Sequence, residues 1–184
     1  SVPVAAVGAG GLALLAVSDD VDYENITTER QLRDYCRGLS QCSSIAIDTE
    51  FVSEHTYRPE LCLVQVSADG RLAAIDALVV GDMRPFWEAI EGDHETIVHS
   101  GRGEMEFCLR VVDRLPARLF DVQLAAGLIG VEYPAGYGSL VAKLLGEASQ
   151  KHETRTDWRR RPLSSRQIQY ALEDVHYLPR LRDT

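Results

Sequence analysis

The chain has 184 residues, a formal net charge of −9 at neutral pH and a hydrophobic fraction of 45%. This length and composition fit one globular domain with a substantial core. The negative charge argues against a protein that coats nucleic acid by bulk charge, although an enzyme with a local basic surface stays possible.

The first 17 residues carry no charged side chain. They lack a basic start, are short for a membrane span and are rich in glycine and alanine. We expect residues 1–20 to be a leader that is disordered or was added in cloning, with a clipped membrane or signal segment as the alternative. Residues 21–184 are expected to form the domain. The cysteines show no metal-ligand spacing and favour buried thiols of an intracellular, cytoplasmic protein; they are Cys36, Cys42, Cys62 and Cys108.

Apolar spacing predicts a helix over residues 24–39, with Thr27 and Thr28 as possible N-caps. Three strands follow this helix directly, and an Asp69–Gly70 turn joins the second of them to the third. The predicted strands cover 43–51, 61–68, 71–78, 95–100 and 117–121, and further helices cover 82–92, 102–112, 122–130, 139–146 and 164–181. Strands that come first and then interleave with helices are typical of an α/β or α+β domain with a mixed sheet.

Two carboxylates, Asp48 and Glu50, lie near the end of the predicted strand 43–51. Side chains two positions apart on a strand point to the same face. Burying both beside an apolar run is costly unless a cation lies between them, and Mg²⁺ prefers carboxylate oxygens. The pair is therefore a candidate metal site. The alternative is a strand end that emerges into solvent.

Tyr170 and Asp174 are four residues apart in the predicted helix 164–181, so their side chains share one face, which Leu178 continues. A tyrosine and an aspartate on the core-facing side of a helix are unusual. The alternative is a core tyrosine beside a solvated aspartate.

A basic run precedes this helix. Residues 151–161 hold five basic side chains against Glu153 and Asp157, a local charge of +3 in an acidic chain; the five are Lys151, Arg155, Arg159, Arg160 and Arg161. Such a concentration next to candidate metal ligands suits a polyanionic substrate. The alternative is an ordinary solvated loop.

Together these features resemble the catalytic domain of ribonuclease D. The matching segments, in the family's order and spacing, are 45–67, 98–107, 119–130 and 155–181. Ribonuclease D belongs to the DEDD 3′–5′ exonucleases, so the resemblance implies an α/β domain of ribonuclease H-like fold, a mixed β-sheet flanked by helices. Ribonuclease D usually continues into helical RNA-binding domains, so a chain that stops at Thr184 is expected to be a shortened piece or a minimal form.

The resemblance places Asp48 and Glu50 on the family's first motif, and Tyr170 and Asp174 on its third motif in the tyrosine (DEDDy) variant. The second motif departs from the pattern. The family has aspartate five residues after a histidine similar to His99, whereas this chain has Glu104.

Helix phase separates Glu104 from its neighbour Glu106. Glu104 borders a predicted apolar stripe formed by Met105, Cys108, Leu109 and Val112. Glu106 lies about 200° further around the helix, at about 100° per residue, and has Arg110 as a natural partner. We therefore expect Glu106 to be solvated and Glu104 to reach a site.

The resemblance implies hydrolysis of phosphodiester bonds with two Mg²⁺ or Mn²⁺ ions. The implied metal ligands are Asp48, Glu50, Glu104 and Asp174, with Asp48 bridging the two ions and Glu104 helping at the second. The same four carboxylates and Tyr170 are the implied catalytic residues, and Tyr170 and Glu50 are expected to orient the attacking water. Substrate binding is expected from Phe51, His99, Lys151 and Arg155, and Gln65 and Asp121 match the family as supporting residues.

The implied partners are single-stranded RNA 3′ ends, tRNA precursors above all, and no membrane. Two alternatives stay open. The first is a 3′–5′ exonuclease that acts on DNA, because recognition of the 2′-hydroxyl is not visible in a sequence. The second is a catalytically impaired nucleic-acid-binding domain, because Glu104 replaces the usual aspartate and one extra methylene moves a carboxylate by about an ångström.

Overall fold

The computed structural model describes residues 22–53, 58–148 and 156–184. The expected leader 1–20 lies outside this part of the chain, and so do Lys151 and Arg155. In the part that is described, no helix is both long and apolar enough to cross a membrane.

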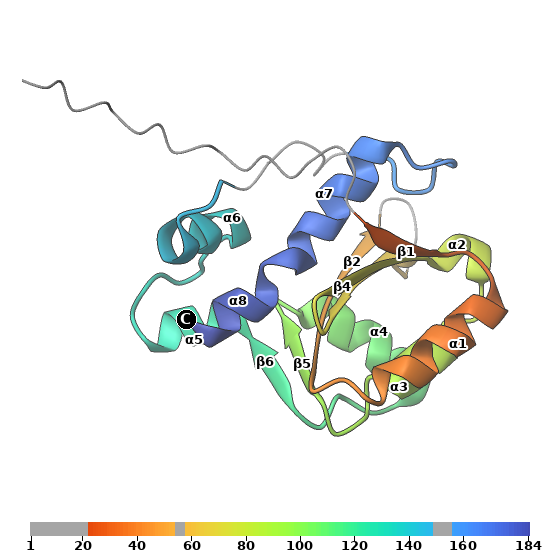
Figure 1. Ribbon diagram of the computed structural model, residues 1–184, viewed down its shortest axis with the longest axis horizontal. Helices are drawn as coiled ribbons and strands as arrows, with labels where there is room; N and C mark the ends of the chain where they lie inside the picture. The colour runs from red at the N-terminus through yellow and green to blue at the C-terminus, as the bar shows by residue number, and fades with distance from the viewer. Residues whose placement is uncertain (1–21, 54–57, 149–155) are drawn as a thin grey trace, which may run out of the picture.

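A mixed sheet forms the centre of the domain (Figure 1), with its strands in the order β1-β4-β3-β2-β5-β6. Their bounds are Tyr23–Ile26 (β1), Ser44–Val52 (β2), Glu60–Ala68 (β3), Arg71–Asp76 (β4), Glu95–Val98 (β5) and Leu119–Asp121 (β6). The β2–β3 and β3–β4 pairs are antiparallel, whereas β1–β4, β2–β5 and β5–β6 are parallel. The expectation of a mixed sheet is thus confirmed. Strand β1 was not predicted from the sequence, and the helix predicted over residues 24–39 was wrong for residues 24–26, which lie in this strand.

Helices cover both faces of this sheet. They are α1 (Glu29–Leu39), α2 (Ala77–Val80), α3 (Arg84–Ala89), α4 (Arg102–Val112), α5 (Val122–Leu128), α6 (Tyr137–Leu140), α7 (Ser165–His176) and α8 (Leu178–Asp183), with a π-helical turn, η1 (Val141–Leu145), directly after α6. On one face, Ile45 and Ile47 of β2 pack in a single core with Leu32 of α1, Trp87 of α3 and Phe107 of α4. The opposite face packs against α7 and α8.

Several local predictions are confirmed. Thr28 caps α1 and accepts a hydrogen bond from the Gln31 N–H. Asp69 and Gly70 both have positive φ angles, 47° and 77°, which the tight turn between β3 and β4 requires. The four cysteines are buried and form no disulfide.

The predicted helix 164–181 is divided at Tyr177 into α7 and α8. The ring of Pro179 removes an N–H donor and clashes with the preceding helical turn, so one continuous helix is unfavourable. Tyr137 bridges the break: its hydroxyl donates to the Glu173 carbonyl at 2.6 Å and accepts from the Tyr177 N–H at 3.3 Å. The prediction of a single helix was therefore wrong at this point.

Candidate active site

The first two carboxylates lie on the central strand. Strand β2 continues to Val52 and is paired with β3 on one side and β5 on the other. Asp48 and Glu50 alternate along it with core residues, so they share the sheet face that α7 covers. Both are partly buried. The alternative of a strand end that emerges into solvent is wrong.

The third carboxylate comes from α7, whose start is fixed by a capping box between Ser164 and Gln167. This helix packs across β2, β3 and β4 and brings Asp174 to the two β2 carboxylates. One oxygen from each of Asp48, Glu50 and Asp174 lies within 4.8 Å of the others. Tyr170, one turn earlier, is hydrogen-bonded to Asp174. The alternative of a solvated Asp174 is therefore wrong.

Crowding and burial change the protonation of this cluster. Burial, followed by the charges of Asp174, Glu104 and Glu50, raises the pKa of Asp48 well above its usual range. Burial, with the charges of Asp174 and Glu104, raises the pKa of Glu50 to about 8. The pKa of Asp174 rises to about 7, chiefly through burial, while the hydrogen bond from Tyr170 acts in the opposite direction.

These three side chains form a donor set that suits a hard divalent cation. They contribute only carboxylate oxygens, and none of them forms an ion pair with an arginine or lysine within the described residues. Partly buried carboxylates so close together repel one another unless a positive charge lies between them. Mg²⁺ and Mn²⁺ both accept such oxygen ligands. The residues present therefore fit the implied metal site.

Glu104 approaches from the other side of β2. It is buried, with 5% of its surface exposed, in the first turn of α4. The hydroxyl of Thr49, which alternates with Asp48 and Glu50 along β2, donates to Glu104 Oε1 at 2.5 Å. Burial raises the pKa of Glu104, and the Thr49 hydrogen bond opposes that shift. Glu104 is close enough to raise the pKa of its β2 neighbours, but it is not one of the three converging ligands.

The predicted difference between the two glutamates is confirmed, since Glu104 is buried and Glu106 is exposed. Two details of the prediction were wrong. Leu109 is exposed, and Phe107 takes its place on the buried face of α4. Glu106 pairs with Arg102 at 2.9 Å, while the guanidinium of Arg110 lies over the Phe107 ring.

Asp121 positions the start of α4. Its carboxylate accepts hydrogen bonds from the N–H groups of Ser100 and Gly101, each at 3.0 Å, and from the Gln123 N–H at 2.9 Å. It therefore joins the end of β6 to the first residues before α4. A side chain at Gly101 would clash with Val98, since an ideal Cβ would lie 2.4 Å from a Val98 methyl group. The chain just before α4 therefore packs closely against the end of β5.

Gln65 lies directly opposite Asp48 in the β2–β3 ladder, and its side chain therefore points to the same face. It is fully buried, and within the described part of the chain neither amide atom has a hydrogen-bond partner. Such buried amides are rare in folded proteins.

Two of the expected substrate-binding residues can be placed. Phe51 is 39% exposed and meets the ring of Phe107 edge-on, with centroids 5.7 Å apart. His99 has an internal contact, because its Nε2 lies 2.8 Å from the Ala135 carbonyl oxygen. The other two, Lys151 and Arg155, lie outside the described residues.

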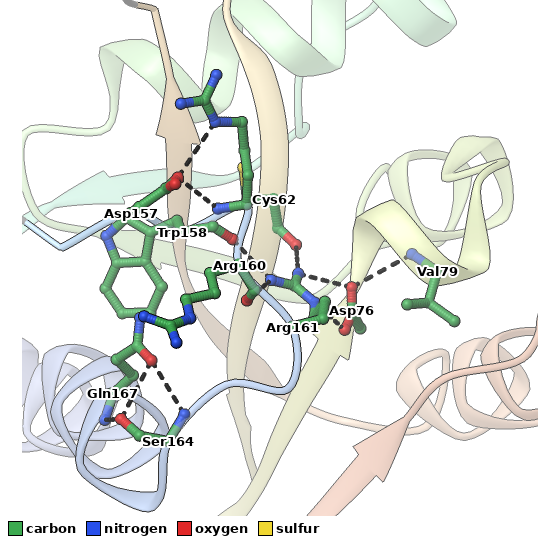
Figure 2. A network of polar contacts seen from close by, with 10 residues as sticks. Cys62, Asp76, Val79, Asp157, Trp158, Arg160, Arg161, Ser164 and Gln167 are labelled. Atoms are coloured by element: carbon green, nitrogen blue, oxygen red, sulfur yellow. Dashed lines mark hydrogen bonds and ion pairs between the residues drawn. The ribbon is translucent and has the colours of Figure 1, made fainter.

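Two arginines of the basic run pair with acidic side chains, as Figure 2 shows. Arg161 forms a two-point ion pair with Asp76, and Arg159 pairs with Asp157 at 3.1 Å. Arg161 is therefore not part of an open basic surface, which corrects that part of the prediction. Trp158, which the sequence reasoning did not single out, is buried beside Tyr170.

Residues 23–184 match the family of 3′–5′ exonuclease domains, and the chain belongs to that family. Within it, the expected resemblance to ribonuclease D is confirmed. The chain is 40% identical to ribonuclease D of Zymomonas mobilis over 159 residues, covering 85% of this chain and 41% of that protein. It is 38% identical to ribonuclease D of Escherichia coli over 159 residues, covering 86% and 42%.

Solved structures agree. The crystal structure of E. coli ribonuclease D, described as an exoribonuclease involved in structured RNA processing, superposes with a TM-score of 0.81 at 38% identity, covering 88% of this chain and 43% of that one. The catalytic core of RRP6 from Trypanosoma brucei has a TM-score of 0.83 at 21% identity over 92% and 47%, which shows a shared fold. The chain spans about two fifths of the length of the curated relatives it matches.

Proposed function

We propose that this chain is a metal-dependent 3′–5′ exoribonuclease domain that removes nucleotides from single-stranded RNA 3′ ends. The observation that carries the proposal is the convergence of Asp48, Glu50 and Asp174 within 4.8 Å, in a chain of the 3′–5′ exonuclease family. RNA is favoured over DNA because the relatives at 38–40% identity are ribonucleases D. Structured RNA is the proposed natural substrate, by analogy with the E. coli relative, and tRNA precursors are the form that the family resemblance implies.

In this proposal Asp48, Glu50 and Asp174 hold one Mg²⁺ or Mn²⁺, and Asp48 and Glu104 contribute to a second. When bound, such ions stabilise the attacking and leaving oxygens of phosphodiester hydrolysis and make water more acidic. The protein's own task is to keep the carboxylates at this spacing although they repel one another. The sheet pairing of β2 and the packing of α7 provide that rigidity.

Tyr170 is assigned the orientation of the attacking water. Burial and the charges of Asp174 and Glu50 raise the pKa of its hydroxyl above the usual value, so at neutral pH it stays protonated and can donate a hydrogen bond. Its bond to Asp174 aims the hydroxyl at the carboxylate cluster. Of the expected substrate contacts, the exposed Phe51 is available to pack against a nucleotide, whereas His99 has a supporting role through Ala135.

The proposal is tested with 5′-labelled and 3′-labelled single-stranded RNA and matched DNA, each with Mn²⁺ and with Mg²⁺. We expect stepwise shortening of the 5′-labelled RNA, immediate loss of the 3′ label, and Mn²⁺ at least as effective as Mg²⁺. Asp48→Asn is expected to abolish shortening while the protein stays folded. Faster digestion of DNA would support the DNA-directed alternative. RNA binding without shortening, unaffected by Asp48→Ala, would instead indicate an impaired binding domain.

A further inference from the structure

The segment before α7 holds a buried tryptophan against the proposed catalytic tyrosine. Trp158 is 4% exposed and packs in one apolar cluster with Ala171 and Leu172 of α7. Its ring centroid lies 6.4 Å from that of Tyr170, with the two planes inclined by 32°. We propose that Trp158 is a positioning residue for Tyr170, and that the ion pair between Arg161 and Asp76 keeps Trp158 in place. This inference rests on the proposed function, because it takes Tyr170 to be a catalytic residue.

The ion pair forms a strong anchor between distant parts of the chain (Figure 2). Arg161 Nε lies 2.5 Å from Asp76 Oδ2, and Arg161 Nη2 lies 2.7 Å from Asp76 Oδ1. Two parallel bonds of this kind fix the orientation of both partners. Asp76 is itself fixed, since it ends β4 and accepts a hydrogen bond from the Val79 N–H at the start of α2.

The same guanidinium also joins the backbone of Trp158 to strand β3. Arg161 Nη1 donates to the Trp158 carbonyl at 2.7 Å, and Nη2 donates to the Cys62 carbonyl of β3 at 3.0 Å. Trp158 is therefore connected through one arginine to two strands of the sheet. The backbone from which its indole ring projects is therefore tied to the sheet.

Tyr170 depends on the packing of the Trp158 ring because α7 fixes only the backbone end of the Tyr170 side chain. The ring can rotate about two torsions, and the hydroxyl must point at Asp174 to act there. Packing from a neighbouring aromatic ring restricts that rotation. A displacement of about 1 Å at a reacting group can cost on the order of 100-fold in rate, so loss of the indole ring is expected to slow the reaction.

The first test is a double-mutant cycle on kcat with 5′-labelled RNA at saturating Mn²⁺. If Trp158 acts through Tyr170, Trp158→Leu lowers kcat by about tenfold or more in the wild-type background and by less than about twofold in the Tyr170→Phe background. Trp158→Phe restores most of the rate. The matched control is Trp87→Leu, which removes a fully buried tryptophan on the other side of the sheet. Its effect is expected to be equal in both backgrounds.

The second test does not depend on turnover. In protein labelled with 3-fluorotyrosine, the ¹⁹F resonance of Tyr170 is assigned by its loss in Tyr170→Phe. We expect Trp158→Leu and Arg161→Lys to shift or split this resonance, and Trp87→Leu to leave it unchanged. Arg161→Lys keeps the charge but loses the two-point geometry, so it carries the test if Trp158→Leu fails to fold.

The outcomes separate the two proposals. Equal effects of Trp158→Leu in both backgrounds, or an unchanged Tyr170 resonance in Trp158→Leu and Arg161→Lys, would overturn the positioning role and leave the nuclease proposal intact. Full activity of Tyr170→Phe would overturn the catalytic role assigned to Tyr170. If the wild type is inactive but its Tyr170 resonance still responds to Arg161→Lys, the nuclease proposal is overturned. The contact between Trp158 and Tyr170 is then retained.

Discussion

Replacing Glu104 by aspartate tests whether the site is built around the longer side chain. The Thr49 hydroxyl reaches Glu104 Oε1 at 2.5 Å. Removing one methylene withdraws the carboxylate by about 1.5 Å. The separation becomes about 4 Å, which is beyond hydrogen-bond range. Glu104→Asp therefore loses a buried hydrogen bond, worth about 1–3 kcal/mol, and displaces a charge that acts on Asp48 and Glu50.

We expect Glu104→Asp to melt several degrees lower, because about 1 kcal/mol corresponds to about 2–4 °C in a domain of this size. Its rate is expected to fall by on the order of 100-fold. The assay is the initial rate of shortening of 5′-labelled RNA, with Mn²⁺ and with Mg²⁺, well below the melting temperature. Two control variants separate the effect of side-chain length at position 104 from the effect of its charge. Glu104→Gln keeps an oxygen within reach of Thr49 and removes the charge, while Thr49→Val removes only the donor.

A Glu104→Asp variant that is faster than the wild type, with an unchanged melting temperature, would refute this reasoning. It would show that the glutamate impairs a site designed for aspartate. Loss of rate in Glu104→Asp without loss in Glu104→Gln would assign the effect to side-chain length alone.

Three further outcomes are expected. The pKa values of Asp174, about 7, and Glu50, about 8, exceed the ordinary values of 3.8 and 4.5, so the metal-free folded protein binds protons that the unfolded chain has released. Its stability should therefore fall as pH rises from about 4 to about 8, while Mn²⁺ affinity rises. Melting curves and calorimetric titrations check both, and a pH-independent Mn²⁺ affinity would contradict the argument. Gln65→Met should raise the unfolding free energy by about 1–3 kcal/mol, since the amide it removes has no partner; a lower melting temperature would show that the amide is in use. Glu106→Gln should leave activity within about twofold, because its pair with Arg102 is solvent-exposed; a large loss of activity would place Glu106 in the site.

The parts of the fold that the sequence predicted well have strong local patterns. Strand β2 carries alternating apolar residues, and α4 was predicted with its observed bounds, Arg102–Val112. Strand β1 escaped prediction because it has only four residues and owes its conformation to parallel pairing with β4. The apolar stripe predicted on α4 included Leu109 in place of Phe107. Phe107 packs with Phe51 and Trp87, and helix spacing alone does not specify these contacts.

The acidic residues of the site were predictable because each lies in a short, recognisable segment. The contacts that hold these acidic residues and their neighbours in place were not predictable. The contact between Thr49 and Glu104 joins residues 55 positions apart, and that between Asp76 and Arg161 joins residues 85 positions apart. Arg161 was counted with a basic surface because its partner lies on a strand with no local relation to it. Pro179, in contrast, was a visible indication that the last helix would divide.

The arrangement of the acidic cluster also affects when activity can arise during synthesis. Asp48 and Glu50 come from an early strand, whereas Tyr170 and Asp174 come from α7, near the end of the described chain. Chains emerge from the ribosome N-terminus first, at about 5–20 residues per second. The growing chain can therefore form β2, β3 and β4 while its acidic cluster is still incomplete. A nuclease of the proposed kind would stay harmless to the messenger and ribosomal RNA around it until α7 had been made and had docked.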